Sequence, residues 1–150
     1  MNCIPASQTI LVVDDSDDDY EATLRALTRG ISLKNPIQRC ENGQECLDYL
    51  FQQGDYALPN IAPRPGIILL DLNMPGIDGR AVLHEIKHDG ALKRIPTIVM
   101  TNSNDERDIT ACYEMGANTY IQKPLNLLSF FEAMARLKEY WFEITLLPKT

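Results

Sequence analysis

The sequence predicts a doubly wound α/β fold, with a five-stranded parallel sheet in the order 2-1-3-4-5 and helices on both faces. Strand-like and helix-like segments alternate five times along the 150 residues, which favours right-handed crossovers onto one parallel sheet. The apolar run over residues 67–70 is too short for a helix and suits a strand buried on both sides. We expect a single domain, with its core at about residues 8–140 and an extension over residues 141–150.

The amino-terminal part is expected to contain two strand–helix pairs. Residues 9–13 are β-branched or apolar and predict the first strand, and Ser16 is a suitable cap for a helix over residues 17–29. A weaker strand is expected over residues 38–40, followed by a helix over residues 43–51. In both helices the apolar residues recur at helical spacing, so each helix has one face to bury against the sheet.

The connection over residues 52–65 is longer than the usual ~2–6 residues of such units and contains three prolines. We expect a surface flap there, with partner binding as the less favoured interpretation.

Three more strand–helix pairs follow this connection. The expected strands are residues 66–70, 97–100 and 118–122, and the expected helices are residues 79–88, 106–115 and 127–140, the last capped by Asn126.

Composition restricts the class of protein. Apolar residues make up 45% of the chain, which is typical of a globular protein. The net charge of −7 and the pI near 4.7 oppose binding to phosphate backbones, so we expect no nucleic-acid partner. The sequence shows neither a signal peptide nor the ~20 apolar residues of a membrane span, so we expect a cytoplasmic protein without a membrane partner. The cysteines lack metal-binding spacing and are expected to be free, partly buried thiols: Cys3, Cys40, Cys46 and Cys112.

Polar residues follow three of the expected strands, at the edge of the sheet where open α/β folds bind ligands. Asp14 and Asp15 follow the first strand, Asp71 follows the third, and Lys123 follows the fifth. Three carboxylates and an amine suit a divalent cation and a phosphoryl group. Asp15 and Asp71 can bind Mg²⁺ directly, Asp14 can bind it directly or through a water, and a backbone carbonyl just past Asp71 can add another oxygen. Mg²⁺ is the expected cofactor, with Mn²⁺ as an alternative.

Phosphoryl transfer depends mainly on positioning and electrostatics, so this short set of groups suffices for it. Asp71, at the end of the central strand, is the expected nucleophile. Lys123 is expected to contact the phosphoryl group, and Thr101 offers a hydroxyl from the end of the fourth strand. The cation neutralises charge that otherwise repels attack by a carboxylate on a phosphoryl group.

The order of these motifs resembles that of the receiver domains of two-component response regulators, over nearly the whole chain. The shared residues are Asp14-Asp15, Asp71 with Met74-Pro75 and Asp78-Gly79, Thr101, Tyr120 and Lys123-Pro124. The resemblance implies a flavodoxin-like fold and a signalling module rather than an enzyme with an external metabolite as substrate. It implies that Asp71 is the phosphoacceptor and takes phosphate from a phosphohistidine on a sensor kinase.

The resemblance also implies roles for the other site residues. Thr101 and Tyr120 resemble the switch pair of the family, in which the hydroxyl turns toward the phosphoryl group and the ring packs inward behind it. The Lys123-Pro124 peptide bond is expected to be cis, as in relatives, which would aim the amine into the site. The metal ligands implied by the resemblance are Asp15, Asp71 and the backbone carbonyl of Asn73, with Asp14 assisting.

Two features distinguish this chain within the family. The proline-rich insertion, the run over residues 117–121 and the ending over residues 140–148 resemble the small cyanobacterial regulators partnered with phytochrome kinases, which consist of a receiver domain alone and dimerise. Asn102 follows Thr101 where relatives mostly carry Ala or Gly. A larger polar side chain there can crowd the phosphoryl group or hydrogen-bond to it, so phosphate lifetime is left open.

The carboxyl-terminal end carries more apolar residues than one helix face can bury, which is typical of an interface. We therefore expect a homodimer formed through this segment. The residues expected at the dimer contact are Trp141, Phe142, Ile144 and Leu146.

Several alternatives compete with this interpretation. His84 and His88 complete the HExxH pattern of zinc proteases, but helical spacing turns both away from the buried face, which favours coincidence. Acidic residues 17–19 in the first turn of a helix are explained by the helix dipole. A phosphatase with Asp15 as nucleophile is the rival enzyme function, and an adaptor that works without phosphorylation is attractive if Asn102 blocks the site.

Overall fold

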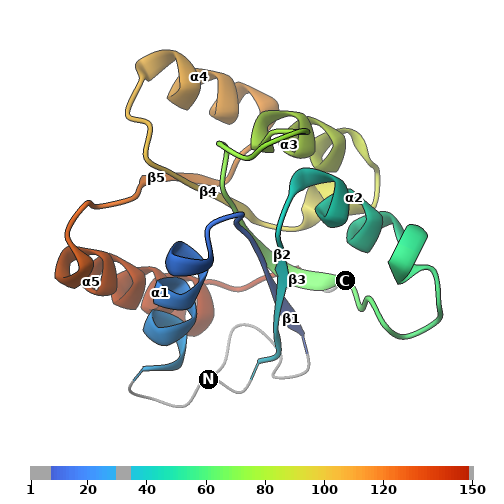
Figure 1. Ribbon diagram of the computed structural model, residues 1–150, viewed down its shortest axis with the longest axis horizontal. Helices are drawn as coiled ribbons and strands as arrows, with labels where there is room; N and C mark the ends of the chain where they lie inside the picture. Colours follow the sequence, from blue (N-terminus) through green and yellow to red (C-terminus); the bar gives the residue numbers. More distant parts are fainter. Residues whose placement is uncertain (1–7, 30–34, 149–150) are drawn as a thin grey trace.

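The computed structural model describes residues 8–29 and 35–148, which form the predicted doubly wound sheet (Figure 1). The strands pair in parallel in the order β2-β1-β3-β4-β5, which confirms the predicted order. The strands are β1 (Thr9–Val13), β2 (Ile37–Cys40), β3 (Pro65–Leu70), β4 (Thr97–Thr101) and β5 (Thr119–Gln122). The helices are α1 (Asp17–Thr28), α2 (Gly43–Phe51), α3 (Gly79–His88), α4 (Glu106–Met115) and α5 (Leu127–Lys138).

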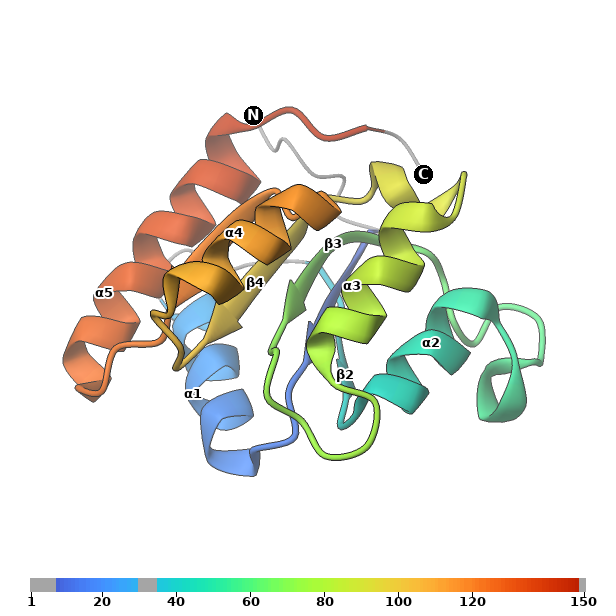
Figure 2. The same cartoon turned by 90° about the horizontal axis from the view of Figure 1, so that it is seen from above.

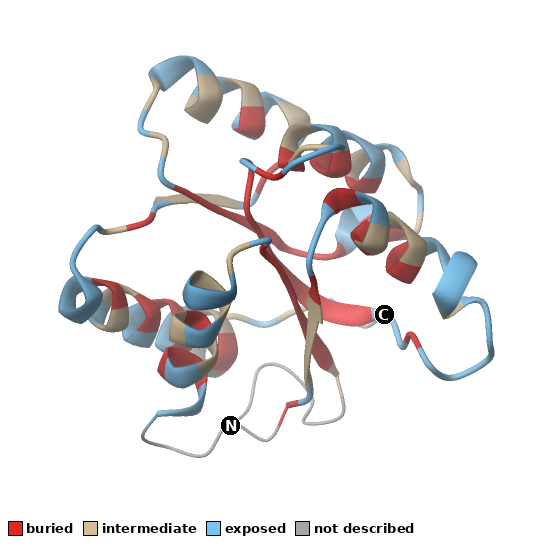
Figure 3. Ribbon diagram, in the orientation of Figure 1, coloured by how far each residue is buried: buried red, intermediate tan, exposed pale blue. Residues whose placement is uncertain are grey.

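Helices cover both faces of the sheet (Figure 2). Helices α1 and α5 pack together on one face, whereas α2, α3 and α4 lie side by side on the other. Successive residues of β1 point to opposite faces of the sheet. Leu11 and Val13 lie in the core beneath α2 and α3. Ile10 and Val12 lie in the core beneath α1 and α5. The central strands are therefore buried on both sides (Figure 3), as the apolar run in β3 predicted.

Local side-chain chemistry explains where the helices begin. The Ser16 hydroxyl accepts a hydrogen bond from the backbone N–H of Asp19 at the start of α1. The Asn126 side chain accepts from Leu128 and Ser129 at the start of α5. Both predicted caps are confirmed, and each satisfies a backbone donor that the first turn leaves free.

The ends of several elements differ slightly from the predictions. Helix α5 ends at Lys138, and the chain continues as a wider, π-helical segment, η3 (Glu139–Ile144), instead of one α-helix to residue 140. The flap between α2 and β3 contains one short helical turn, η1 (Gly54–Tyr56), and the connection between α3 and β4 contains η2 (Leu92–Arg94). The flap is mostly exposed, as predicted, although it is anchored where the Tyr49 hydroxyl donates to the carbonyl of Pro63 at 2.7 Å.

The other predictions from composition can be compared with the described residues. Cys40, Cys46 and Cys112 are free, as predicted, and they are fully buried instead of partly buried. Cys3 lies outside the described residues. Within the described ranges, none of the helices has the length and apolar character that crossing a bilayer requires.

The carboxyl-terminal segment lies against the α1 and α5 side of the sheet. Phe142 is buried in that core and Trp141 packs partly against it, so Phe142 supports the fold instead of facing a partner. Leu146 is 79% exposed, and the side chain of Ile144 lies outside the part that the structure describes. The dimer contact itself stays a prediction.

Candidate functional site

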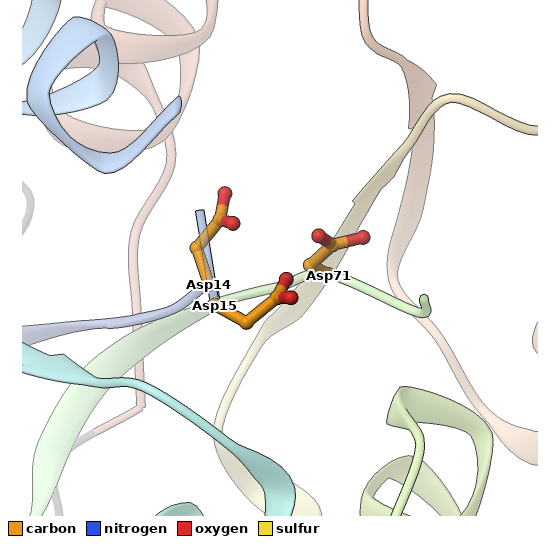
Figure 4. Close-up of side chains that lie close together, drawn as sticks. All are labelled: Asp14, Asp15 and Asp71. Atoms are coloured by element: carbon orange, nitrogen blue, oxygen red, sulfur yellow. The ribbon is translucent and has the colours of Figure 1, made fainter. Parts of the chain in front are cut away.

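The carboxylates at the ends of β1 and β3 form the candidate site (Figure 4). Asp14, Asp15 and Asp71 each place a carboxylate oxygen within 4.8 Å of the others. Asp14 and Asp71 are buried, whereas Asp15 is exposed. The sheet accounts for this arrangement. The last paired residues of β1 and β3 are Val13 and Leu70, so Asp14 and Asp71 follow side by side at the carboxyl ends of these strands.

Lys123 brings a buried positive charge from the end of β5 into this cluster. Its Nζ atom lies 2.8 Å from Asp14, 2.9 Å from Asp19 and 3.4 Å from Asp71. Burial lowers the pKa of Lys123, but the hydrogen bond and charge of Asp14, together with Asp71 and Asp19, raise it more, so its net pKa is raised. The amine is therefore charged at neutral pH and offsets part of the repulsion among the carboxylates.

The buried Asp71 carboxylate is subject to opposing electrostatic influences. The net pKa of Asp71 is raised to about 6, chiefly by burial. The Lys123 charge and a backbone hydrogen bond from Asn73 oppose this rise, whereas the Asp14 charge adds to it. The Asn73 N–H donates to one carboxylate oxygen at 3.2 Å, and Lys123 approaches the other. Above about pH 6 the group is ionised, and its negative charge is held in place by two donors.

The donor set fits a hard divalent cation. Three carboxylates with oxygens within 4.8 Å of one another are the ligands that Mg²⁺ and Mn²⁺ prefer, and exposed Asp15 leaves one side open to water ligands. Among the described residues this is the one group of three or more His, Cys, Asp or Glu side chains close enough to hold an ion. The role predicted for the Asn73 carbonyl stays a prediction.

Thr101 and Tyr120 are linked through the loop after β4. Thr101 is fully buried, and its Oγ1 accepts from the side-chain amide of Asn73 at 3.0 Å and from the Ser103 N–H at 3.4 Å. The half-buried Tyr120 packs against the core beneath α2 and α3, and its hydroxyl donates to the Ser103 carbonyl at 3.0 Å. Asn102, between Thr101 and Ser103, is exposed.

The predicted cis bond at Lys123-Pro124 is wrong, since the peptide bonds in the described part of the chain are all trans. The lysine nevertheless reaches the site, because its side chain is long and flexible enough to contact Asp14 and Asp71 from a trans backbone. The backbone N–H of Lys123 donates to the Thr101 carbonyl at 2.7 Å, which fixes the end of β5 beside β4.

The HExxH pattern lies away from this site. His84 and His88 are exposed on α3, as helical spacing predicted, with their rings stacked at 3.9 Å between centroids. Neither belongs to a candidate metal cluster in the described part of the chain. The coincidental interpretation of this pattern is consistent with both observations.

Sequence reasoning missed several participants. The helix-dipole explanation for Asp19 is incomplete, since this carboxylate also contacts Lys123. The sequence does not indicate Ser103, Asp108 and Arg80, which form a hydrogen-bonded chain behind Thr101. Spacing along the sequence carries no signal for that chain, because it joins α3, α4 and the loop after β4.

Comparisons with known proteins identify the family. The response regulator receiver domain matches residues 10–135. The chain is 38% identical over 141 residues to the response regulator Rcp1 of Synechocystis sp., covering 94% of this chain and 93% of the relative. It is also 38% identical to the phosphorylated cyanobacterial phytochrome response regulator RcpA, whose crystal structure superposes with a TM-score of 0.89 over 95% of this chain and 99% of that one. The Mn²⁺-bound form of Rcp1 gives a TM-score of 0.88 at 38% identity, with the same coverage. The chain therefore belongs to the response regulator receiver domain family.

Proposed function

We propose that the chain accepts a phosphoryl group on Asp71 from a phosphohistidine of a sensor kinase, and so acts as a phosphorylation switch. The observation that carries this proposal is the buried Asp71 carboxylate, held between the Lys123 amine and the exposed Asp15 at the end of the central strand. Such a carboxylate is a nucleophile whose surroundings also bind the incoming phosphate charge.

The transfer exchanges one phosphorus bond for another. A carboxylate oxygen of Asp71 bonds to phosphorus as the P–N bond of phosphohistidine breaks, and the released imidazole takes up a proton from solvent. Lys123 orients the phosphoryl oxygens and offsets their charge, and Asp14 keeps this amine charged and in place. Asp15 and Asp71, with Asp14 and the Asn73 carbonyl, would hold Mg²⁺ or Mn²⁺, which supplies charge neutralisation between nucleophile and phosphoryl group.

The switch is a change in the loop after β4. Thr101 turns its hydroxyl toward the new phosphoryl oxygens. Tyr120 then breaks its hydrogen bond to the Ser103 carbonyl, and its ring moves inward behind Thr101. Asn102, exposed beside Thr101, tunes access of water to the phosphoryl group. The altered surface then contacts a partner or a second copy of the chain.

The kinase that fits the family evidence is a phytochrome. RcpA is a cyanobacterial phytochrome response regulator, and its structure aligns with 95% of this chain and 99% of its own. We propose the same partnership here, in the cytoplasm, with a homodimer formed through the carboxyl-terminal segment and no external metabolite as substrate.

The proposal is tested by intact mass after incubation with acetyl phosphate and Mg²⁺. We expect a gain of one phosphoryl group on the wild-type chain, and no gain for Asp71→Asn or when EDTA removes the cation. Retention of the gain in Asp71→Asn, with loss in Asp15→Asn, would instead support the phosphatase-like nucleophile. No gain from acetyl phosphate or from a phosphorylated phytochrome kinase contradicts the proposal and favours an adaptor that works without phosphorylation.

A further inference from the structure

A chain of hydrogen bonds runs from the candidate site to the surface of α3 and α4. It begins at Thr101, whose hydroxyl accepts from the Ser103 N–H, and passes from the Ser103 hydroxyl to Asp108 at 2.8 Å. The other carboxylate oxygen of Asp108 accepts two bonds from Arg80, at 2.7 Å and 3.2 Å. We call Ser103, Asp108 and Arg80 together the Ser103 latch.

Ser103, in the loop after β4, is hydrogen-bonded through its backbone and its side chain. Its N–H bonds Thr101, its carbonyl accepts from Tyr120, and its hydroxyl both donates to Asp108 and accepts from the Asp105 N–H at 3.2 Å. Every polar group of Ser103 is therefore engaged. Two of its partners, Thr101 and Tyr120, are the proposed switch residues, so movement of either one away from Ser103 breaks a hydrogen bond.

The far end of the latch is fixed by an ion pair between two helices. Arg80 in α3 and Asp108 in α4 have only 32% and 24% of their side chains exposed, so water competes weakly for their bonds. Hydrogen bonds from Arg80 and Ser103 lower the pKa of Asp108, which keeps it ionised at neutral pH. Helix α4 is thus held to α3 in the arrangement that keeps the Ser103 hydroxyl bound.

We propose that the Ser103 latch stabilises the unphosphorylated arrangement of the β4–α4 loop and thereby sets the affinity of Asp71 for a phosphoryl group. This inference rests on the proposed function and names the residues that regulate it. When Thr101 turns toward a phosphoryl oxygen, it pulls on the Ser103 N–H, and the bonds from Ser103 to Asp108 and Tyr120 oppose that movement. Ser103, Asp108 and Arg80 are positioning residues, since none of them contacts Asp71 in this structure.

The test compares binding of beryllofluoride, a phosphoryl mimic, at saturating Mg²⁺ by fluorine NMR. Ser103→Ala removes the link to Asp108, and Asp108→Asn weakens its bonds to Arg80 and Ser103 without changing its shape. Each variant is expected to bind beryllofluoride about three- to tenfold more tightly than wild type, as the loss of one net hydrogen bond predicts. The double variant is expected to gain less than the product of the two effects, because both substitutions break the same link.

A matched control separates the latch from general loosening of the loop. Arg107→Gln removes an ion pair to Asp105 of similar length, 2.9 Å, on the same loop and helix, but the 91% exposed Arg107 does not contact Ser103. This control is expected to bind like wild type. Tighter binding is also the opposite of what partial unfolding would cause, and a melting curve in EDTA verifies that each variant is folded.

The outcomes distinguish the two proposals. A wild-type chain that binds beryllofluoride, with Ser103→Ala and Asp108→Asn equal to it or weaker, overturns the latch and leaves the phosphoacceptor role intact. A wild-type chain that binds none and takes no phosphoryl group on Asp71 overturns the proposed function and the latch with it. Tighter binding in both latch variants, but not in Arg107→Gln, supports the latch.

Discussion

At the scale of single residues, the site is built from groups that oppose folding. Asp71 and Asp14 are buried carboxylates that face each other across a single lysine, and burying such charges costs stability unless each is paired. The motif Asp14-Asp15 and the residue Asp71 could be predicted as a cluster because they follow adjacent parallel strands. Asp19 could not, because its contact with Lys123 depends on how the first turn of α1 is placed relative to the residue that follows β5.

Replacing Asp71 by Asn is expected to stabilise the metal-free protein. The pKa of Asp71 is about 6 in the folded chain against 3.8 ordinarily, so the folded state binds the proton more tightly and protonation favours folding. The wild type therefore loses stability as pH rises from about 4 to about 6, and the variant does not. The expected gain for Asp71→Asn is about 1–2 kcal/mol above pH 6, less than the full shift implies because water reaches the site.

The measurement is urea unfolding in EDTA across this pH range. The difference in free energy of unfolding between Asp71→Asn and wild type should grow with pH and become constant above about pH 6. A variant that is less stable than wild type at every pH would contradict this account of Asp71.

At the scale of elements, α3 begins almost in contact with the strand end that carries Asp71. The Gly79 N–H donates to the Leu72 carbonyl at 2.8 Å, and a Cβ atom at Gly79 would collide with the Asp71 carbonyl oxygen and lie 2.6 Å from the Leu72 Cα. The start of α3 at Gly79 and the bounds of most helices were predictable, because they depend on neighbouring residues; the structure adds that Asp78 caps α3. The close approach at Gly79 was not, since it arises from tertiary packing.

Gly79→Ala is therefore expected to displace the loop that carries Asp71. Backbone atoms cannot move aside as a side chain can, so we expect a loss of about 2–3 kcal/mol in the free energy of unfolding and weaker Mg²⁺ binding. Gly90→Ala is the matched control, because nothing lies within 4 Å of a Cβ atom there. Chemical unfolding and a Mg²⁺ titration check both variants, and equal stability for them would contradict the packing argument.

At the scale of the whole molecule, alternating strands and helices predicted a parallel sheet covered on both faces, and the doubly wound fold type predicted its strand order. The apolar runs predicted strands that are buried on both faces. The structure has two separate hydrophobic cores, one on each face of the sheet. What composition could not predict is which apolar residues beyond α5 stay exposed. Phe142 joins the core, whereas Leu146 remains 79% exposed, and only the packing of η3 against the fold decides between them.

The exposed end of the chain is expected to form the homodimer contact. At micromolar concentration, light scattering should give a dimer mass for wild type, and Leu146→Ser should shift it toward the monomer. Leu58→Ser is the matched control, because Leu58 is a similarly exposed leucine, 70% accessible, on the flap. A monomer mass for the wild-type chain would contradict this prediction.

The position of Trp141 has a consequence for spectroscopy. It is the single tryptophan of the chain, it stacks edge-on with Tyr140 at 5.4 Å, and it lies past the far end of α5 from Lys123. The 12 residues of α5 span about 18 Å, so the indole lies near the amino ends of the strands and the carboxylates lie at their carboxyl ends. The fluorescence of Trp141 therefore reports on the carboxyl-terminal segment. A change in this fluorescence upon phosphorylation would show that a change at Asp71 reaches the opposite end of the fold.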